Sequence, residues 1–310
     1  MTHRPVLGRE VVEALQPKKS GVYIDATFGR GGYTALLLES GAGRVVAIDR
    51  DPEAAKAAEV FKQRYGDRFL FLTGCFGDMV RIVRAANINT VDGIAFDIGV
   101  SSPQLDTAER GFSFRLDGPL DMRMSTTGRS AADIVNTAGE AELADILYQL
   151  GEERASRRIA KAIVEARCVK AFERTTELAA TIASVVPKHS EIHPATKSFQ
   201  ALRIAVNDEL GELQRGLQAA LELLQSGGRI AVVTFHSLED RIVKEFFRTQ
   251  AGRIGQISRH RPLVAATLAP SLRLVNNKAI TPSDEECRQN SRARSAKLRV
   301  AEKITGDSVC

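Results

Sequence analysis

A glycine-rich turn is the first feature of the sequence that could do chemistry. It reads Asp25-Ala-Thr-Phe-Gly-Arg-Gly-Gly-Tyr-Thr34 and follows a short apolar run. Clustered glycines at the point where a strand turns into a helix let the backbone approach a ligand closely and aim amide N–H groups at it. The turn alone is a weak signal, because similar turns also start helices that bind no ligand.

Three further side chains stand near the ends of later apolar runs. Asp49 follows Gly31 by 18 residues, where an acid can accept hydrogen bonds from both hydroxyls of a ribose. Phe76 could place its ring against an adenine, and Asp97 ends the fourth run. Because the carboxyl ends of parallel strands meet at one edge of a sheet, this set predicts a nucleoside-cofactor site. Taken singly, Asp25 and Asp97 could instead cap a loop or a helix, and Phe76 could pack in the core.

Two nucleoside cofactors are compatible with this pattern. A nicotinamide dinucleotide calls for a full G-x-G-x-x-G, and here Thr34 stands at the place of the last glycine. In adenosylmethionine enzymes an acid in this turn can meet the cationic amino group of the methionine part, and Asp25 matches that arrangement. The turn therefore favours adenosylmethionine, with an NAD-dependent oxidoreductase as the alternative.

The elements that must position these residues alternate regularly. The predicted strands are short apolar runs, at 21–27, 44–49, 68–73 and 91–97. The predicted helices lie between them, at 33–40, from Asp51 onward and at 78–86. The alternation resumes later with strands at 227–235 and 297–302 and a helix at 238–248, and Gly227-Gly228 is expected to end the preceding helix. Continuous apolar strands between helices are typical of a parallel sheet covered on both faces, so we predict a doubly wound α/β domain.

A block without strand patterns interrupts this alternation between about residues 103 and 207. Its helical patterns follow one another, at 140–150, 152–169, 176–186 and from Ala195 onward. We therefore expect a cofactor-binding sheet domain at 1–103 and 208–310 and an inserted helical substrate-recognition domain at 104–207. Arg154, Arg157, Arg158 and Lys161 are spaced to lie on neighbouring turns of one helix and could grip a polyanion, although a dimerisation role for the block is the alternative.

The composition sets outer limits on the kind of protein. Of the 310 residues 44% are hydrophobic and 26% charged, as in soluble globular proteins, and no apolar run approaches the ~20 residues of a membrane-spanning helix. The four cysteines follow no CxxC spacing, which argues against a zinc cluster or a disulfide scaffold and favours a reducing cytoplasm. The net charge of +5 allows a polyanionic partner without showing one.

Basic residues dominate one segment near the end of the chain. Residues 251–283 contain Arg253, Arg259, Arg261, Arg273 and Lys278 and no acidic residue. Contact with phosphates would explain this asymmetry, and a solvated loop would explain it as well.

With these motifs in view, the sequence closely resembles the RsmH (MraW) family over nearly its whole length. In the first half the matching motifs are His3–Leu7, Tyr23–Gly32, Ala47–Pro52, Asp97–Asp106, Glu109–Phe114 and Asp117–Met124. In the second half they are Gly151–Arg154, His193–Thr196, Phe199–Asn207, Phe235–Val243 and Arg292–Ser295. Members of this family are S-adenosylmethionine-dependent methyltransferases that modify N4 of one cytidine in 16S ribosomal RNA.

The resemblance implies a fold, a cofactor and a partner. It implies a Rossmann-like class I methyltransferase sheet with an inserted all-helical domain, S-adenosylmethionine as cofactor, and no metal. The expected substrate is 16S rRNA in the decoding region of the small ribosomal subunit, which places the protein in the cytoplasm and away from membranes, and a homodimer stays open. The implied cofactor contacts are Gly31, Gly32, Tyr33, Asp49, Phe76, Asp97 and Gln104. Some family members carry histidine in place of Tyr33, so a backbone contact is expected there.

No catalytic base can be named from the sequence. DNA amino-methyltransferases commonly use a D/N/S-P-P-Y/F/W tetrapeptide after the fourth strand, but residues 97–103 here lack the paired proline and the aromatic residue. Asp97 could orient the amine or hold the cofactor, and we favour the second role. His236 follows the fifth strand and could contact the base or a phosphate, or be structural. Phe112 or Phe114 could stack on a base or pack under the inserted block. A third overall hypothesis is an RNA-binding assembly module without catalysis.

Overall fold

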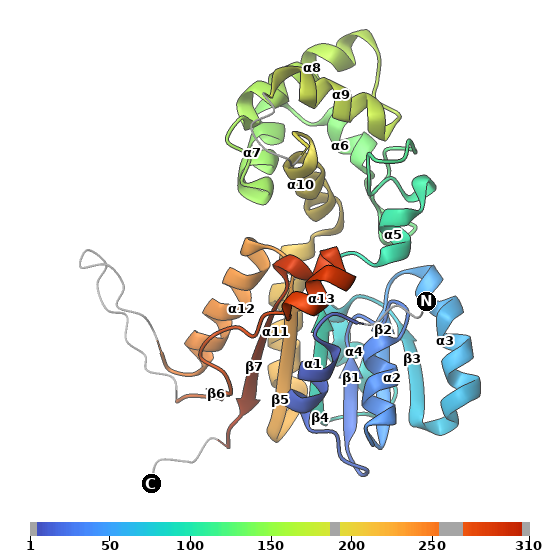
Figure 1. Ribbon diagram of the computed structural model, residues 1–310, viewed down its shortest axis with the longest axis vertical. Coiled ribbons are helices and arrows are strands. Elements are labelled where there is room, and N and C mark those ends of the chain that lie inside the picture. Colours follow the sequence, from blue (N-terminus) through green and yellow to red (C-terminus); the bar gives the residue numbers. More distant parts are fainter. Residues whose placement is uncertain (1–4, 187–192, 254–268, 306–310) are drawn as a thin grey trace. The chain divides into compact units, whose positions relative to one another are not determined.

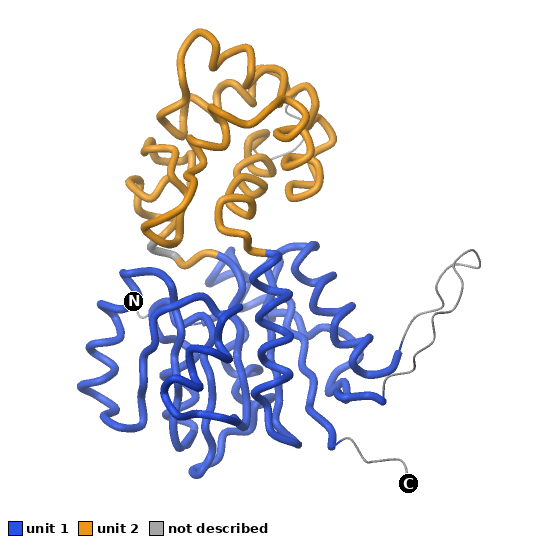
Figure 2. Tube along the Cα trace, turned by 180° about the vertical axis from the view of Figure 1, so that it is seen from behind, with its two compact units in different colours: residues 1–99, 210–310 blue, residues 100–209 orange. Residues whose placement is uncertain are grey.

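The computed structural model describes residues 5–186, 193–253 and 269–305, and only the backbone of residues 102–103. The chain divides into two compact units, which Figure 2 shows in different colours. Unit 1 consists of residues 1–99 and 210–310, and unit 2 of residues 100–209. The expected domain limits, after residues 103 and 207, lie close to these boundaries.

Within the described residues, unit 1 contains a seven-stranded sheet (Figure 1). The strands are β1 (Val22–Asp25), β2 (Arg44–Asp49), β3 (Phe69–Thr73), β4 (Val91–Asp97), β5 (Leu224–Thr234), β6 (Leu272–Leu274) and β7 (Lys297–Lys303). Their order is β3-β2-β1-β4-β5-β7-β6, in which β1 to β5 pair in parallel and β7 pairs antiparallel with β5 and β6. The predicted doubly wound, Rossmann-like sheet is confirmed.

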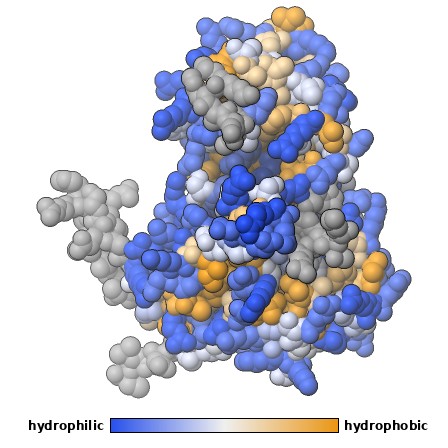
Figure 3. Space-filling view, in the orientation of Figure 1, coloured by the Kyte–Doolittle hydropathy of each residue, from blue (hydrophilic) through white to orange (hydrophobic). Residues whose placement is uncertain are grey.

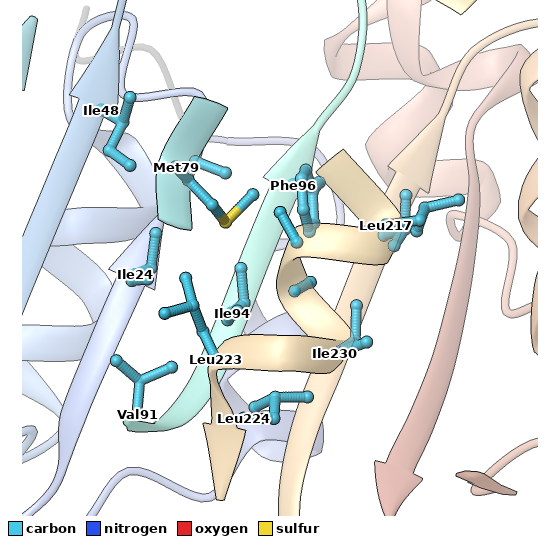
Figure 4. Close-up of a cluster of buried hydrophobic side chains, with 14 of the residues drawn as sticks. Ile24, Ile48, Met79, Val91, Ile94, Phe96, Leu217, Leu223, Leu224 and Ile230 are labelled. Carbon is cyan, nitrogen blue, oxygen red and sulfur yellow. The ribbon is translucent and has the colours of Figure 1, made fainter. Parts of the chain in front are cut away.

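Helices cover both faces of this sheet. They are α1 (Gly8–Leu15), α2 (Gly32–Glu39), α3 (Pro52–Tyr65), α4 (Met79–Ala85), α11 (Glu209–Leu223) and α12 (Ser237–Gln250). The short helix α13 (Asp284–Gln289) also belongs to unit 1 but has no buried residue. Successive side chains of a strand point to opposite faces. Accordingly Ile94 and Phe96 pack in one apolar cluster, with Met79 of α4 and Leu217 of α11 (Figure 4), whereas Ala95 packs in the other. Burial on both faces explains why the strands are continuous apolar runs.

Unit 2 is helical. Its helices are α5 (Ser102–Asp106), α6 (Ala131–Thr137), α7 (Glu140–Gly151), α8 (Ser156–Val169), α9 (Thr175–Val185) and α10 (Thr196–Asn207). In the part of unit 2 that the structure describes, β pairing is limited to an isolated bridge between Pro119 and Arg174. Leu143, Ile159 and Leu202 are fully buried in its apolar core, so unit 2 has a core of its own.

The structure corrects three details of the sequence prediction. Gly227-Gly228 does not end a helix, because α11 ends at Leu223 and both glycines lie within β5, where its pairing with β4 shifts register between Leu224 and Arg229. The helix expected from residue 152 begins at Ser156, so Arg154 lies in the preceding turn. The short edge strand β6 was not predicted. Arg259 and Arg261 of the basic segment lie outside the described residues.

The outer surface is mixed in character. On the face shown in Figure 3, hydrophilic residues predominate and hydrophobic ones occur in small groups between them. None of the helices among the described residues is both long and apolar enough to cross a lipid bilayer.

Candidate functional site

The glycine turn between β1 and α2 is braced by Asp25. The Asp25 carboxylate is fully buried and accepts hydrogen bonds from Thr34 N at 3.1 Å, Thr34 Oγ1 at 2.7 Å and Thr27 N at 3.3 Å. Burial raises the pKa of Asp25 to about 6, although these hydrogen bonds oppose the rise. Asp25 thus caps the start of α2, which is the structural role that the sequence left open for it.

The glycines of the turn are required by space and by backbone conformation. Gly31 has a φ of 77°, and a Cβ atom there would lie 2.3 Å from Cζ of Phe61. At Gly32, which begins α2, a Cβ atom would lie 3.0 Å from Cβ of Pro5. The Tyr33 ring is buried, and its hydroxyl donates a hydrogen bond to the Val6 carbonyl. Since the Tyr33 side chain is engaged in this way, a ligand contact at this residue would fall to its backbone.

Asp49, at the end of β2, organises the same turn from the neighbouring strand. Its Oδ2 accepts the Gly29 N–H at 2.7 Å, and its Oδ1 accepts the Asp51 N–H at 2.8 Å. Burial raises the pKa of this carboxyl group. A carboxylate oxygen can accept two hydrogen bonds, so each oxygen of Asp49 could also accept one from a ribose hydroxyl.

Asp97, at the end of β4, has the most unusual environment of the strand-end acids. Its backbone N–H donates to Thr27 Oγ1 at 2.7 Å, which ties β4 to the glycine turn. Its side-chain Oδ1 is buried and has no hydrogen-bond partner among the described residues. Burial, together with the carboxyl groups of Asp25 and Glu239, raises the pKa of Asp97 to about 8. A buried oxygen without a partner is costly in a folded protein and calls for an explanation such as a ligand.

Phe76 lies in a short 3-10 turn, Phe76–Asp78, that follows β3. Its partly buried ring packs edge-on against Phe96, with 5.6 Å between the ring centroids. The ring therefore belongs to the rim of the apolar core and is not sealed within it. Both roles considered for Phe76, core packing and contact with an adenine, are compatible with this position.

Gln104 belongs to α5 of unit 2, whereas the other six predicted contact residues lie in unit 1. Its side chain is buried, and its Oε1 accepts the Ser101 N–H at 2.9 Å. Unit 1 thus brings together the glycine turn and the ends of β2, β3 and β4.

The two phenylalanines considered for base stacking are engaged within unit 2. Phe112 is buried, and the Arg110 guanidinium lies 5.6 Å from its ring centroid. The Phe114 ring lies 4.6 Å from the His193 ring and 4.8 Å from the Phe199 ring. Both rings therefore pack inside the inserted unit, and neither is free to stack on a base.

His236 and Glu239 form a buried pair after β5, of which the sequence analysis identified only His236. His236 caps α12: its Nδ1 accepts the Glu239 N–H at 3.4 Å. Glu239 is fully buried, and its Oε2 accepts the N–H groups of Phe235 and His236 at 2.7 and 3.2 Å. His236 Nε2 lies 2.8 Å from Glu239 Oε1, but the two atoms are not aligned for a hydrogen bond. The capping-box spacing of His236 and Glu239 was the signal that could have identified Glu239.

The chemistry of these donors and acceptors suits a cation better than a phosphate. The carboxyl oxygens Asp97 Oδ1 and Glu239 Oε1 are buried without hydrogen-bond partners in the described part of the chain. Asp97 ends β4, and Glu239 lies on α12, which follows the adjacent strand β5. In the turn itself, the Gly29 N–H is taken by Asp49 and the Gly31 N–H by the Phe28 carbonyl. S-adenosylmethionine carries a sulfonium and an ammonium group, which buried carboxyl oxygens attract, whereas they would repel the pyrophosphate of NAD.

Comparisons with known proteins agree with this chemistry. The sequence pattern of the MraW methylase family matches residues 1–304. Ribosomal RNA small subunit methyltransferase H of Paramagnetospirillum magneticum is 57% identical over 301 residues, covering 96% of this chain and 95% of that protein. The enzyme of the same name from Rhodospirillum rubrum is 54% identical over 306 residues, covering 97% of this chain and 94% of that protein.

A solved structure was also matched. The crystal structure of an rRNA methylase from Streptococcus thermophilus aligns with 98% of this chain and 99% of that chain, at 12% identity and a TM-score of 0.43. The family match and the two relatives confirm the predicted methyltransferase, and the alternative of an NAD-dependent oxidoreductase is wrong. The chain belongs to the MraW methylase family.

Proposed function

We propose that this protein transfers the methyl group of S-adenosylmethionine to N4 of a cytidine in the 16S rRNA of the small ribosomal subunit. Membership of the MraW methylase family, with relatives named ribosomal RNA small subunit methyltransferases, supports methylation of ribosomal RNA. The base, its position in the decoding region and a cytoplasmic location rest on the sequence resemblance. A homodimer stays a prediction.

The single observation that carries the cofactor assignment is the unpartnered, buried Oδ1 of Asp97. In this proposal Asp97 faces the cationic methionine part of the cofactor. The backbone at Gly31, Gly32 and Tyr33 forms the wall beside it, while Asp49 accepts the ribose hydroxyls. Phe76 lies against the adenine. A cofactor contact at Gln104 rests on the sequence resemblance alone.

When bound, S-adenosylmethionine supplies an electrophilic methyl group on a positively charged sulfur. The cytosine amino group is a poor nucleophile because its lone pair is delocalised into the ring. Most of the rate should therefore come from holding the amine in line with the methyl group. No described residue needs to act as a strong base for this task, and Asp97 and the neighbouring backbone position the cofactor.

Unit 2 is the proposed site of RNA binding. Arg157, Arg158 and Lys161 are exposed on α8, and Arg154 is exposed in the turn before it. Lys161 lies 3.8 Å from Glu165, a loose and exposed pair that would contribute little to stability. An exposed row of this kind can neutralise phosphates of an RNA backbone while an extruded base is held for the reaction.

Labelled S-adenosylmethionine and small ribosomal subunits from a strain that lacks this gene provide the test. We expect label in 16S rRNA and, after digestion, in N4-methylcytidine identified by nucleoside mass spectrometry. Label at another atom or in another RNA would contradict the proposed specificity. Absence of transfer to any RNA would favour the assembly module without catalysis.

A further inference from the structure

Helix α11 contains a glycine, Gly216, at a position where the backbone conformation would allow any residue. Gly216 lies in the middle of this helix and does not have a positive φ. A glycine inside a helix destabilises it by roughly 0.5–1 kcal/mol relative to alanine. The reason for a glycine at this position must therefore lie in what packs against it.

The neighbour of Gly216 is the ring of Phe76. A Cβ atom at Gly216 would lie 2.5 Å from Cδ2 and 2.9 Å from Cε2 of that ring, and 3.3 Å from Cε1 of Phe96. The Phe96 ring is fixed in the core beside Leu217 of α11 (Figure 4). Since the Phe76 ring packs edge-on against Phe96, a methyl group at position 216 would displace the Phe76 ring rather than the core.

The backbone next to Phe76 is held by the preceding turn of the same helix. The Gly77 N–H donates to Glu212 Oε2 at 2.9 Å. Arg215 Nη2 donates to Glu212 Oε1 at 2.8 Å, which orients the buried carboxylate. A Cβ atom at Gly77 would itself lie 2.8 Å from Glu212 Oε2, so Gly77 admits the contact. One helix thus fixes both the ring of Phe76 and the peptide that follows it.

We propose that Gly216 and Glu212 of α11 are positioning residues for the cofactor: they set the place of the Phe76 ring and so the wall of the adenine pocket. This inference rests on the proposed contact between Phe76 and the adenine. Gly216 acts by leaving room for the ring, and Glu212 acts by anchoring the Gly77 amide. Neither residue needs to touch the cofactor.

Titration with S-adenosylhomocysteine, the product of the cofactor, tests this without measuring activity. In Gly216→Ala we expect affinity to fall about tenfold, the scale of one lost stack between a base and an aromatic ring. The melting temperature without ligand should stay near that of the wild type, because the better helix propensity of alanine offsets part of the clash. Gly139→Ala is the control, since nothing lies within 4 Å of its added Cβ atom. Wild-type affinity in Gly216→Ala would overturn the proposal.

A double variant separates positioning from a general loss of structure. Phe76→Leu should weaken binding by itself, and adding Gly216→Ala to it should cause no further loss, because the displaced ring is gone. A further tenfold loss in the double variant would contradict the proposal. If Phe76→Leu binds S-adenosylhomocysteine like the wild type, the adenine contact of the proposed function fails, and this inference fails with it. If Phe76→Leu is weak and Gly216→Ala is normal, only this inference fails.

Variants of Glu212 give a second test. Glu212→Gln keeps a carbonyl oxygen that can accept the Gly77 N–H and should bind with nearly wild-type affinity. Glu212→Ala removes the acceptor and should raise KM for S-adenosylmethionine several-fold with little change in kcat. Equal behaviour of the two variants would overturn the role assigned to Glu212.

Discussion

In each unit, the sign of a local cluster of charged groups is opposite to the sign of the unit's net charge. Unit 2 contains 14 of the 43 Lys and Arg residues and 16 of the 38 Asp and Glu residues, so it is net acidic and unit 1 holds the whole basic surplus. Yet unit 1 gathers buried carboxyl groups at the ends of its strands, and unit 2 exposes a basic row at Arg154, Arg157, Arg158 and Lys161. The proposed roles of the two units therefore rest on the local placement of charges and not on the totals.

The contrast in burial is as important as the contrast in sign. A carboxyl group such as that of Asp97 lies in a medium of low polarity, where a cation is attracted strongly. The basic row at Arg154, Arg157, Arg158 and Lys161 is exposed, and its attraction for phosphates is long-ranged and weakened by salt. We therefore expect cofactor binding to depend on single buried groups and RNA binding to depend on several exposed ones together.

The largest effect is expected when the basic row of unit 2 is neutralised. In the quadruple variant Arg154→Gln, Arg157→Gln, Arg158→Gln, Lys161→Gln, methylation of small subunits should fall about a hundredfold or more, because each lost phosphate contact removes nearly one unit from the salt dependence of binding. Affinity for S-adenosylmethionine should not change. Filter binding over a range of salt concentrations measures the slope, and Lys56→Gln with Lys62→Gln on α3 is a control that removes two exposed charges from unit 1. Normal methylation in the quadruple variant would show that this row does not bind the RNA.

An effect of about 1.5–3 kcal/mol on cofactor binding is expected for Asp49→Ala, the range for hydrogen bonds to a charged group. Since the Asp49 carboxylate also accepts the N–H groups of Gly29 and Asp51, we expect a loss of unfolding free energy as well. Calorimetric titration and thermal unfolding separate the two effects. Wild-type cofactor affinity in this variant would refute the ribose contact.

A smaller effect is expected from the basic segment of unit 1. Replacing Arg253, Arg259 and Arg261 together by Gln should flatten the salt dependence of RNA binding by at most about three units and leave cofactor affinity unchanged. The Arg253 side chain already donates to Asn277 Oδ1 at 2.7 Å, so its share should be the weakest of the three. An unchanged slope would identify the segment as a solvated loop.

Much of the fold and of the site could be predicted because their signals are local. Apolar runs marked β1, β2, β3 and β4, and Asp51-Pro52 marked the start of α3, where the Asp51 side chain does accept the Glu53 N–H. The residues that were missed act across the fold. Glu212 reaches Gly77 over 135 positions of sequence, and Gly216 matters only because Phe76 packs on it. No local pattern carries such information.

Two further details have a similar origin. Gly227-Gly228 was expected to end a helix, but both glycines lie in the part of β5 between Leu224 and Arg229, where the pairing with β4 shifts register. For Phe114 the sequence left stacking on a base and packing in the inserted block open, and its ring lies against the rings of His193 and Phe199. Tertiary contacts, which no local pattern shows, decide both details.

Proton release on cofactor binding tests the central assignment most directly. With a pKa of about 8, the Asp97 carboxyl group is mostly protonated in the free protein at pH 7, and a cation bound beside it favours the ionised form. Isothermal titration of S-adenosylmethionine at pH 7, in buffers of different ionisation enthalpy, should therefore show release of about one proton per cofactor. The apparent affinity should increase as the pH rises from 6 to 8, and Asp97→Asn should lose both effects. Binding that releases no proton in the wild type, or that keeps the same release and pH dependence in Asp97→Asn, would contradict the account.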